Sequence, residues 1–155
     1  MKGDADVIQV LNDVLCAELT AINQYFIHAM MCENWRLTKL AKHMREESIG
    51  EMKHAEDVIG RILYLDGRPN MQKYMKINVG KNVPEMHQFD LEVERDAVAR
   101  LNPGVELCRS KGDNGSRLLL EKILAEVEQH IDWLEAQLQQ IQDMGLPNYL
   151  ANQAD

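Results

Sequence analysis

Carboxylates and imidazoles occur on otherwise apolar stripes of this 155-residue chain. Glu51 and His54 are three positions apart, which places both side chains on one face of a helix, one turn from each other. Glu18 lies on an earlier apolar stripe, and Glu94 and His130 lie on later ones. Burying an ionised carboxylate is unfavourable unless a partner compensates for the lost hydration. A transition-metal ion supplies that compensation, so these residue types indicate a metal site.

The potential ligands form two sets that are related by a constant offset. Glu18 and Glu94 are 76 residues apart, and the two histidines are separated by the same distance. The position in the second half that corresponds to Glu51 is occupied by Val127, which cannot coordinate a metal. We therefore predict two matched half-sites, of which the second lacks one bridging carboxylate. Core polar residues that satisfy one another without a metal are the alternative interpretation.

Val127 has two interpretations. In the first, Val127 is an ordinary core residue. In the second, a neighbouring carboxylate, Glu126 or Glu128, takes the place of the missing ligand. Each of these neighbours lies about 100° around the helix from residue 127, so a direct replacement would be strained.

Four stretches with helical periodicity position the candidate ligands. Apolar residues recur every three or four positions over about 6–34, 38–65, 84–110 and 116–144. Residues 67–83 contain glycine and proline and have no clear period, so they form a long connection. We predict an all-α, ferritin-like four-helix bundle in a single domain, residues 1–155. Its long crossover joins helices 2 and 3, and a short fifth helix follows at the C-terminus.

Local signals refine the expected helices. Asp4 or Asp6 can cap the first helix. Pro103 and Gly104 are expected to kink or interrupt the third, because proline lacks a backbone donor and clashes with the preceding turn.

Composition excludes several classes of protein. The net charge is −8 and no basic cluster offsets it, which disfavours nucleic acid as a partner. No uncharged apolar run is long enough to span a membrane, and the acidic N-terminus is unlike a signal peptide. Three cysteines without a CxxC pair suit a reducing compartment. We expect a cytoplasmic protein.

Several longer stretches resemble a known family. They are MKGD at 1–4, AINQYF at 21–26, ESI at 47–49, EMKHA at 51–55, RIL at 61–63, HIDWLE at 130–135 and NYL at 148–150. Over essentially its whole length the chain resembles bacterioferritin. The resemblance implies iron storage in a hollow shell of 24 subunits, arranged as twelve two-fold dimers. It also implies a b-type haem between the two members of each dimer, with Met52 of each subunit as an axial ligand.

The same resemblance implies a dinuclear ferroxidase centre, which oxidises Fe²⁺ to Fe³⁺ with dioxygen or peroxide. Tyr25 would lie close to it, Glu51 would be the remaining bridging carboxylate, and Val127 stands where the sixth ligand is usual. The implied ligands are Glu18, Glu51, His54, Glu94 and His130.

The missing ligand leads us to expect slow oxidation by this subunit alone. A second bacterioferritin subunit type in the same shell would then supply the fast reaction, and a ferredoxin-type protein is a candidate electron donor to the haem. One alternative is a fully active ferroxidase in which Glu126, Glu128, Glu47 or water fills the gap. Another is a haem-binding structural bundle that does not oxidise iron.

Overall fold

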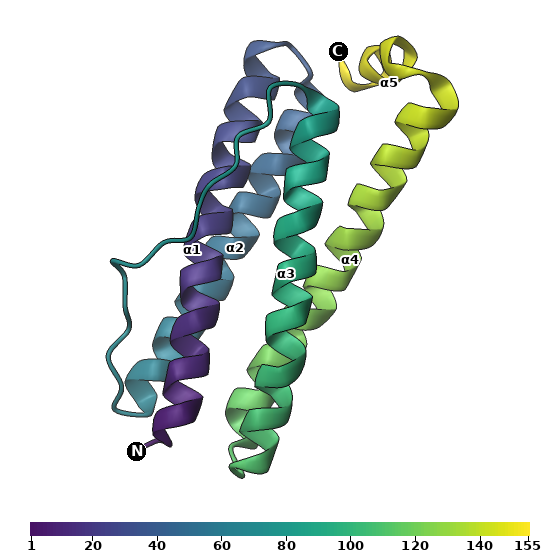
Figure 1. Cartoon of the computed structure of the whole chain (residues 1–155). Coiled ribbons are helices and arrows are strands. Elements are labelled where there is room, and N and C mark those ends of the chain that lie inside the picture. The colour runs from purple at the N-terminus through teal and green to yellow at the C-terminus, as the bar shows by residue number, and fades with distance from the viewer.

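Helices account for all the regular structure of the chain. The computed structural model describes residues 1–155 and contains five helices and no strand. They are α1 (Ala5–Asn34), α2 (Thr38–Tyr64), α3 (Val83–Ser110), α4 (Asn114–Met144) and α5 (Leu146–Gln153). The four long helices form a bundle and α5 folds over one end of it (Figure 1). The predicted ferritin-like bundle is confirmed, and the predicted bounds are within two residues of those observed.

Side-chain caps fix where three of the long helices begin. Asp4 accepts hydrogen bonds from the backbone of Asp6 and Val7, at 2.8 and 3.3 Å. Asn82 and Asp113 cap α3 and α4 in the same way. Each cap satisfies backbone donors that have no partner within the first turn of the helix.

None of the helices combines the length and apolar character that crossing a membrane requires.

The long crossover lies against α1. It leaves the end of α2 at one end of the bundle and runs along the bundle to the start of α3 at the opposite end (Figure 1). It thereby connects the helix pair α1 and α2 to the pair α3 and α4. Its backbone N–H groups donate to α1 side chains spaced four residues apart. The bonds are Met75 N to Thr20 Oγ1 (2.9 Å), Asn78 N to Gln24 Oε1 (3.1 Å) and Gly80 N to His28 Nε2 (2.9 Å).

Two apolar clusters fill the bundle. One includes Leu11, Ile62 and Leu120, and the other lies near α5 and includes Met86 and Tyr149. Along α2 and α3 the candidate ligands fall between the segments that build these two clusters, whereas Glu18 on α1 is adjacent to Leu19 of the first cluster. The site is therefore a buried polar layer with an apolar cluster on each side, which excludes water from its ends.

The sequence predicts a kink or an interruption at Pro103, and α3 is not interrupted there. The helix is continuous from Val83 to Ser110 with Pro103 inside it. Pro103 and Ala99, the residue whose carbonyl loses its helical donor, are both exposed, so water can bond to that carbonyl. Gly104 is buried instead, where an added Cβ would lie 3.0 Å from Val10 Cγ1.

Candidate metal centre

The five predicted ligands converge from all four long helices. Glu18 comes from α1, Glu51 and His54 from α2, Glu94 from α3 and His130 from α4. All five are buried, with exposed fractions of 8% or less. Such burial of ionisable side chains requires hydrogen-bond or metal partners.

Glu18, Glu51 and His54 form one tight group. His54 Nδ1 lies 3.5 Å from Glu18 Oε2 and 3.4 Å from Glu51 Oε2. The potential ligand atoms of the three residues are all within 4.8 Å of one another. Two of these atoms, Glu18 Oε2 and His54 Nδ1, are buried without a hydrogen-bond partner. A buried polar atom left in this state destabilises a protein by about 1–3 kcal/mol, so the group fits a cation held between its atoms.

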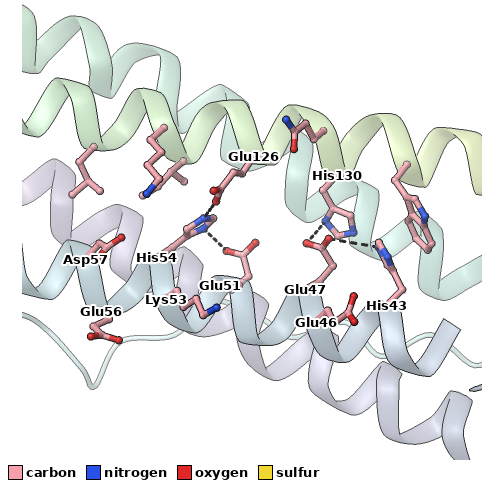
Figure 2. Close-up of a pocket in the computed structure, with 16 residues that line it drawn as sticks. His43, Glu46, Glu47, Glu51, Lys53, His54, Glu56, Asp57, Glu126 and His130 are labelled. Carbon is pink, nitrogen blue, oxygen red and sulfur yellow. Dashed lines mark hydrogen bonds and ion pairs between the residues drawn. The ribbon is translucent and has the colours of Figure 1, made fainter. Parts of the chain in front are cut away.

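The opposite nitrogen of His54 has a partner of its own. Glu126 on α4 contacts His54 Nε2 with its half-exposed carboxylate (Figure 2). Burial alone would lower the pKa of His54, but the carboxylates of Glu18 and Glu126 outweigh burial and raise it to about 9. A metal at Nδ1 would replace the proton on that nitrogen, while Glu126 would keep the proton on Nε2, which is a common arrangement around metal-bound histidine. Glu126 therefore orients His54, a candidate ligand, and its carboxylate lies against the ring nitrogen that faces away from Glu18 and Glu51.

Glu94 and His130 form a second pair. His130 Nδ1 is 3.1 Å from Glu94 Oε1, and the buried hydroxyl of Tyr25 donates a short hydrogen bond to the same carboxylate. Burial, reinforced by Glu94, raises the pKa of Tyr25 well above its usual value and keeps the hydroxyl a donor. For His130, burial lowers the pKa, while Glu94 and Glu47 raise it and prevail.

Val127 is buried at 2% exposure in the apolar cluster that also contains Leu19, Ala55 and Ile123. Its side chain provides no ligand atom, so the second half-site has fewer ligands than the first.

A cavity opens beside these residues, between α2 and α4 (Figure 2). Its volume is about 730 Å³, and its wall includes both candidate histidines, Glu51 and Glu126. His43 and Glu47 also line it, and sequence reasoning did not select His43. The signal was present, because His43, Glu47 and Glu51 follow one another at intervals of four residues.

Met52 points away from the buried group. Its side chain is 57% exposed, and Ile49, one turn earlier on α2, is also exposed. Phe26 on α1 is exposed too, and Arg45 of α2 lies 5.7 Å from the centre of its ring. An exposed thioether among apolar side chains fits a contact between subunits that could also hold a flat, apolar cofactor.

A four-helix bundle that brings buried carboxylates and imidazoles together from its four long helices belongs to the ferritin-like class of metal-binding proteins. The family model for the ferritin-like domain matches residues 8–144. "Bacterioferritin BfrA" of Mycobacterium tuberculosis is 49% identical over 151 residues, which cover 97% of this chain and 95% of that protein. The bacterioferritin of Streptomyces coelicolor is 51% identical, with 97% and 90% covered.

Solved structures agree with the sequence relatives. The structure of Mycobacterium tuberculosis bacterioferritin, BfrA, superposes with a TM-score of 0.99 at 48% identity, over all of this chain and 98% of that one. The chain belongs to the bacterioferritin family of iron-storage proteins.

Proposed function

We propose that this chain is an iron-storage subunit that binds Fe²⁺ at Glu18, Glu51 and His54 and oxidises it slowly on its own. The observation that carries the proposal is the pair of buried atoms without partners, Glu18 Oε2 and His54 Nδ1, beside the Glu51 carboxylate. Two carboxylates and one imidazole suit iron, because carboxylates favour Fe³⁺ over Fe²⁺ while imidazole binds both. The group can therefore bind the substrate and favour its oxidation.

Slow turnover follows from the second half-site. Reduction of dioxygen or peroxide by paired Fe²⁺ ions requires both to be held close together. Val127 offers no carboxylate between the two halves, so of the two positions related by the internal offset only Glu51 carries one. A subunit of a second type in the same shell would supply the fast oxidation, while this chain would contribute storage capacity and haem.

The exposed face around Met52 supports the haem role. A b-type haem between two subunits would be held by the Met52 thioether of each, with Ile49 and Phe26 as apolar neighbours. When bound, the haem supplies an electron path toward stored ferric iron. We further propose the family assembly of twelve dimers in a 24-subunit cytoplasmic shell.

Stopped-flow measurement of Fe²⁺ oxidation by the purified homopolymer tests the oxidation proposal. We expect slow oxidation together with retention of iron in the assembled shell. Fast oxidation of two Fe²⁺ per subunit would contradict the proposal. Absence of retained iron would favour a structural, haem-binding role.

A fully active ferroxidase is the second candidate function. One contact favours it: Glu47 Oε2 lies 3.4 Å from His130 Nδ1, so a carboxylate other than residue 127 is available near the second half-site. The same stopped-flow measurement separates the two candidates.

A further inference from the structure

A second group of potential ligands meets at the other end of the cavity. His43 and Glu47 come from α2 and His130 from α4, and their potential ligand atoms lie within 4.8 Å of one another. Glu47 lies between the two imidazoles, with Oε1 3.5 Å from His43 Nε2 and Oε2 3.4 Å from His130 Nδ1 (Figure 2). The carboxylate thus faces one ring nitrogen of each histidine.

His43 has a ring nitrogen without a hydrogen bond. Nε2 is buried and has no partner that meets hydrogen-bond geometry. The ring stacks on Trp133, with 3.5 Å between ring centres and 12° between planes, so its orientation is fixed. A shielded nitrogen held beside a carboxylate and a second imidazole offers a metal a prearranged set of donors.

The order of ligands along α2 separates this group from the first. His43, Glu47, Glu51 and His54 follow at intervals of four, four and three residues, along one face of the helix. The first two belong to the new group and the last two to the Glu18 group. One turn separates Glu47 from Glu51, which is a rise of about 6 Å. Val127 supplies no carboxylate that would draw a second ion toward Glu51, and Glu47 is the α2 carboxylate whose potential ligand atom groups with His130.

We propose that His43, Glu47 and His130 form a second, separate site for a borderline divalent transition-metal ion. This inference rests on the proposed iron function and specifies where the second Fe²⁺ binds in a chain that lacks the bridging carboxylate. Two imidazoles and one carboxylate, with further positions open, form a donor set that both Zn²⁺ and non-haem Fe²⁺ accept. Glu94, which contacts His130 Nδ1 at 3.1 Å, is the available fourth ligand.

Titration of the assembled, metal-free protein with Co²⁺, followed by visible absorption, tests the proposal without relying on oxidation activity. The parent protein should bind two Co²⁺ per subunit. Glu47→Gln and His43→Gln should each weaken one of the two by at least tenfold and leave the other unchanged. Glu46→Gln is the matched control, because Glu46 lines the same cavity and its substitution removes one negative charge, as Glu47→Gln does. This control should bind both ions as the parent does.

Anomalous diffraction from Co²⁺-soaked crystals locates the ions. We expect one peak beside Glu18, Glu51 and His54 and another between His43 and His130. The proposal is wrong if the parent binds one ion only, if Glu47→Gln retains both affinities, or if the second peak bridges Glu51 and Glu94. It is also wrong if the Glu46 control loses the ion to the same extent.

The two proposals fail in different ways. Loss of the second peak with retention of the first overturns the new site and leaves the proposed iron function intact. Absence of the peak at Glu18, Glu51 and His54 overturns the proposed function itself. If His43→Gln does not assemble, Glu47→Gln gives the same reading with a change of only one functional group.

Discussion

Glu126 of α4 contacts Nε2 of His54, the ring nitrogen opposite the one that faces Glu18 and Glu51. This contact ties α4 to the ligand group on α1 and α2 without placing a ligand in it. It also stores a proton at the site, because the surrounding carboxylates raise the pKa of His54 to about 9 despite its burial. A metal that binds His54 at Nδ1 must therefore displace the proton on that nitrogen.

Proton release on metal binding tests this relationship. At pH 7.5 His54 is mostly protonated, since its pKa is about 9, so Co²⁺ binding should release close to one proton from it. Glu126→Gln removes a charge that raises this pKa and should reduce the release. Calorimetry in two buffers with different ionisation enthalpies measures the difference. Glu128→Gln, a change at an exposed acid on the same helix, should release as many protons as the parent. Equal release from both variants would contradict the role of Glu126.

The periodic features of the chain could be predicted from sequence, whereas contacts between helices could not. Apolar periodicity located the four long helices, and the repeat at a fixed offset identified Glu94 and His130 as partners in the second half. The role of Glu126 depended on where its side chain turns after leaving α4. His43 was missed because its significance comes from the contact with Glu47 and the stack on Trp133.

Pro103 shows the same limit in the backbone. Proline inside a helix predicts a kink or an interruption on local grounds, yet the helix continues through Pro103, where Pro103 and Ala99 are both exposed and water can reach the carbonyl that loses its donor. Exposure of that face is a property of the packed bundle. Local sequence rules therefore predicted where the helices lie, but not that α3 continues through Pro103.

Restoring a carboxylate at position 127 should accelerate oxidation and destabilise the metal-free protein. Val127→Glu places a carboxylate between the half-sites, so we expect a faster initial phase of Fe²⁺ oxidation by stopped flow. Without metal the new carboxylate is buried in an apolar cluster and should lower the free energy of unfolding by about 2–4 kcal/mol. Added Co²⁺ should recover much of this loss, as measured by thermal unfolding.

Val127→Gln is the matched control for that substitution. It has the same number of side-chain heavy atoms as glutamate but cannot ionise, so it should destabilise the protein without accelerating oxidation, and Co²⁺ should stabilise it no more than it stabilises the parent. Equal oxidation rates for the two variants would show that a missing ligand is not what limits the reaction.

Met52 should be required for haem binding. Met52→Leu keeps an apolar side chain of similar size on the exposed face but removes the thioether. We expect the assembled variant to lose the Soret absorption of bound haem almost completely. Met30→Leu, at another exposed methionine on α1, should bind haem as the parent does. Haem retained by the Met52 variant would rule out the thioether as the axial ligand.

Gln24 should hold the long crossover against α1. It is fully buried, donates to Asp90 at 2.8 Å and accepts from Asn78 N at 3.1 Å. Gln24→Leu leaves the Asn78 N–H without its acceptor and leaves Asp90 with His28 as its remaining partner, so we expect a loss of about 1–3 kcal/mol in the free energy of unfolding. Hydrogen exchange should rise at Asn78 and not in the centre of α2. Gln9→Leu, an exposed glutamine of the same helix, should change neither quantity.

His87 should make the bundle sensitive to mild acid. The ring is fully buried with Nε2 3.0 Å from the Tyr149 hydroxyl, and burial lowers its pKa to about 4. In the unfolded chain a histidine binds a proton near pH 6.5, whereas the folded His87 stays neutral until about pH 4. The unfolded state therefore binds more protons in this range, and stability is lost as the pH falls from 6.5 to 4, by up to about 1.4 kcal/mol per pH unit from this residue.

Urea unfolding at a series of pH values and one protein concentration measures this slope. His87→Gln keeps an amide that can bond to Tyr149 but cannot titrate, so its stability should fall less steeply between pH 6.5 and 4. His43 has a lowered pKa of about 4 for the same reason and contributes in parallel, so part of the slope should remain. The double variant His43→Gln/His87→Gln should flatten it further. A slope that stays at the parent value in both variants would show that protonation of other groups controls the acid response.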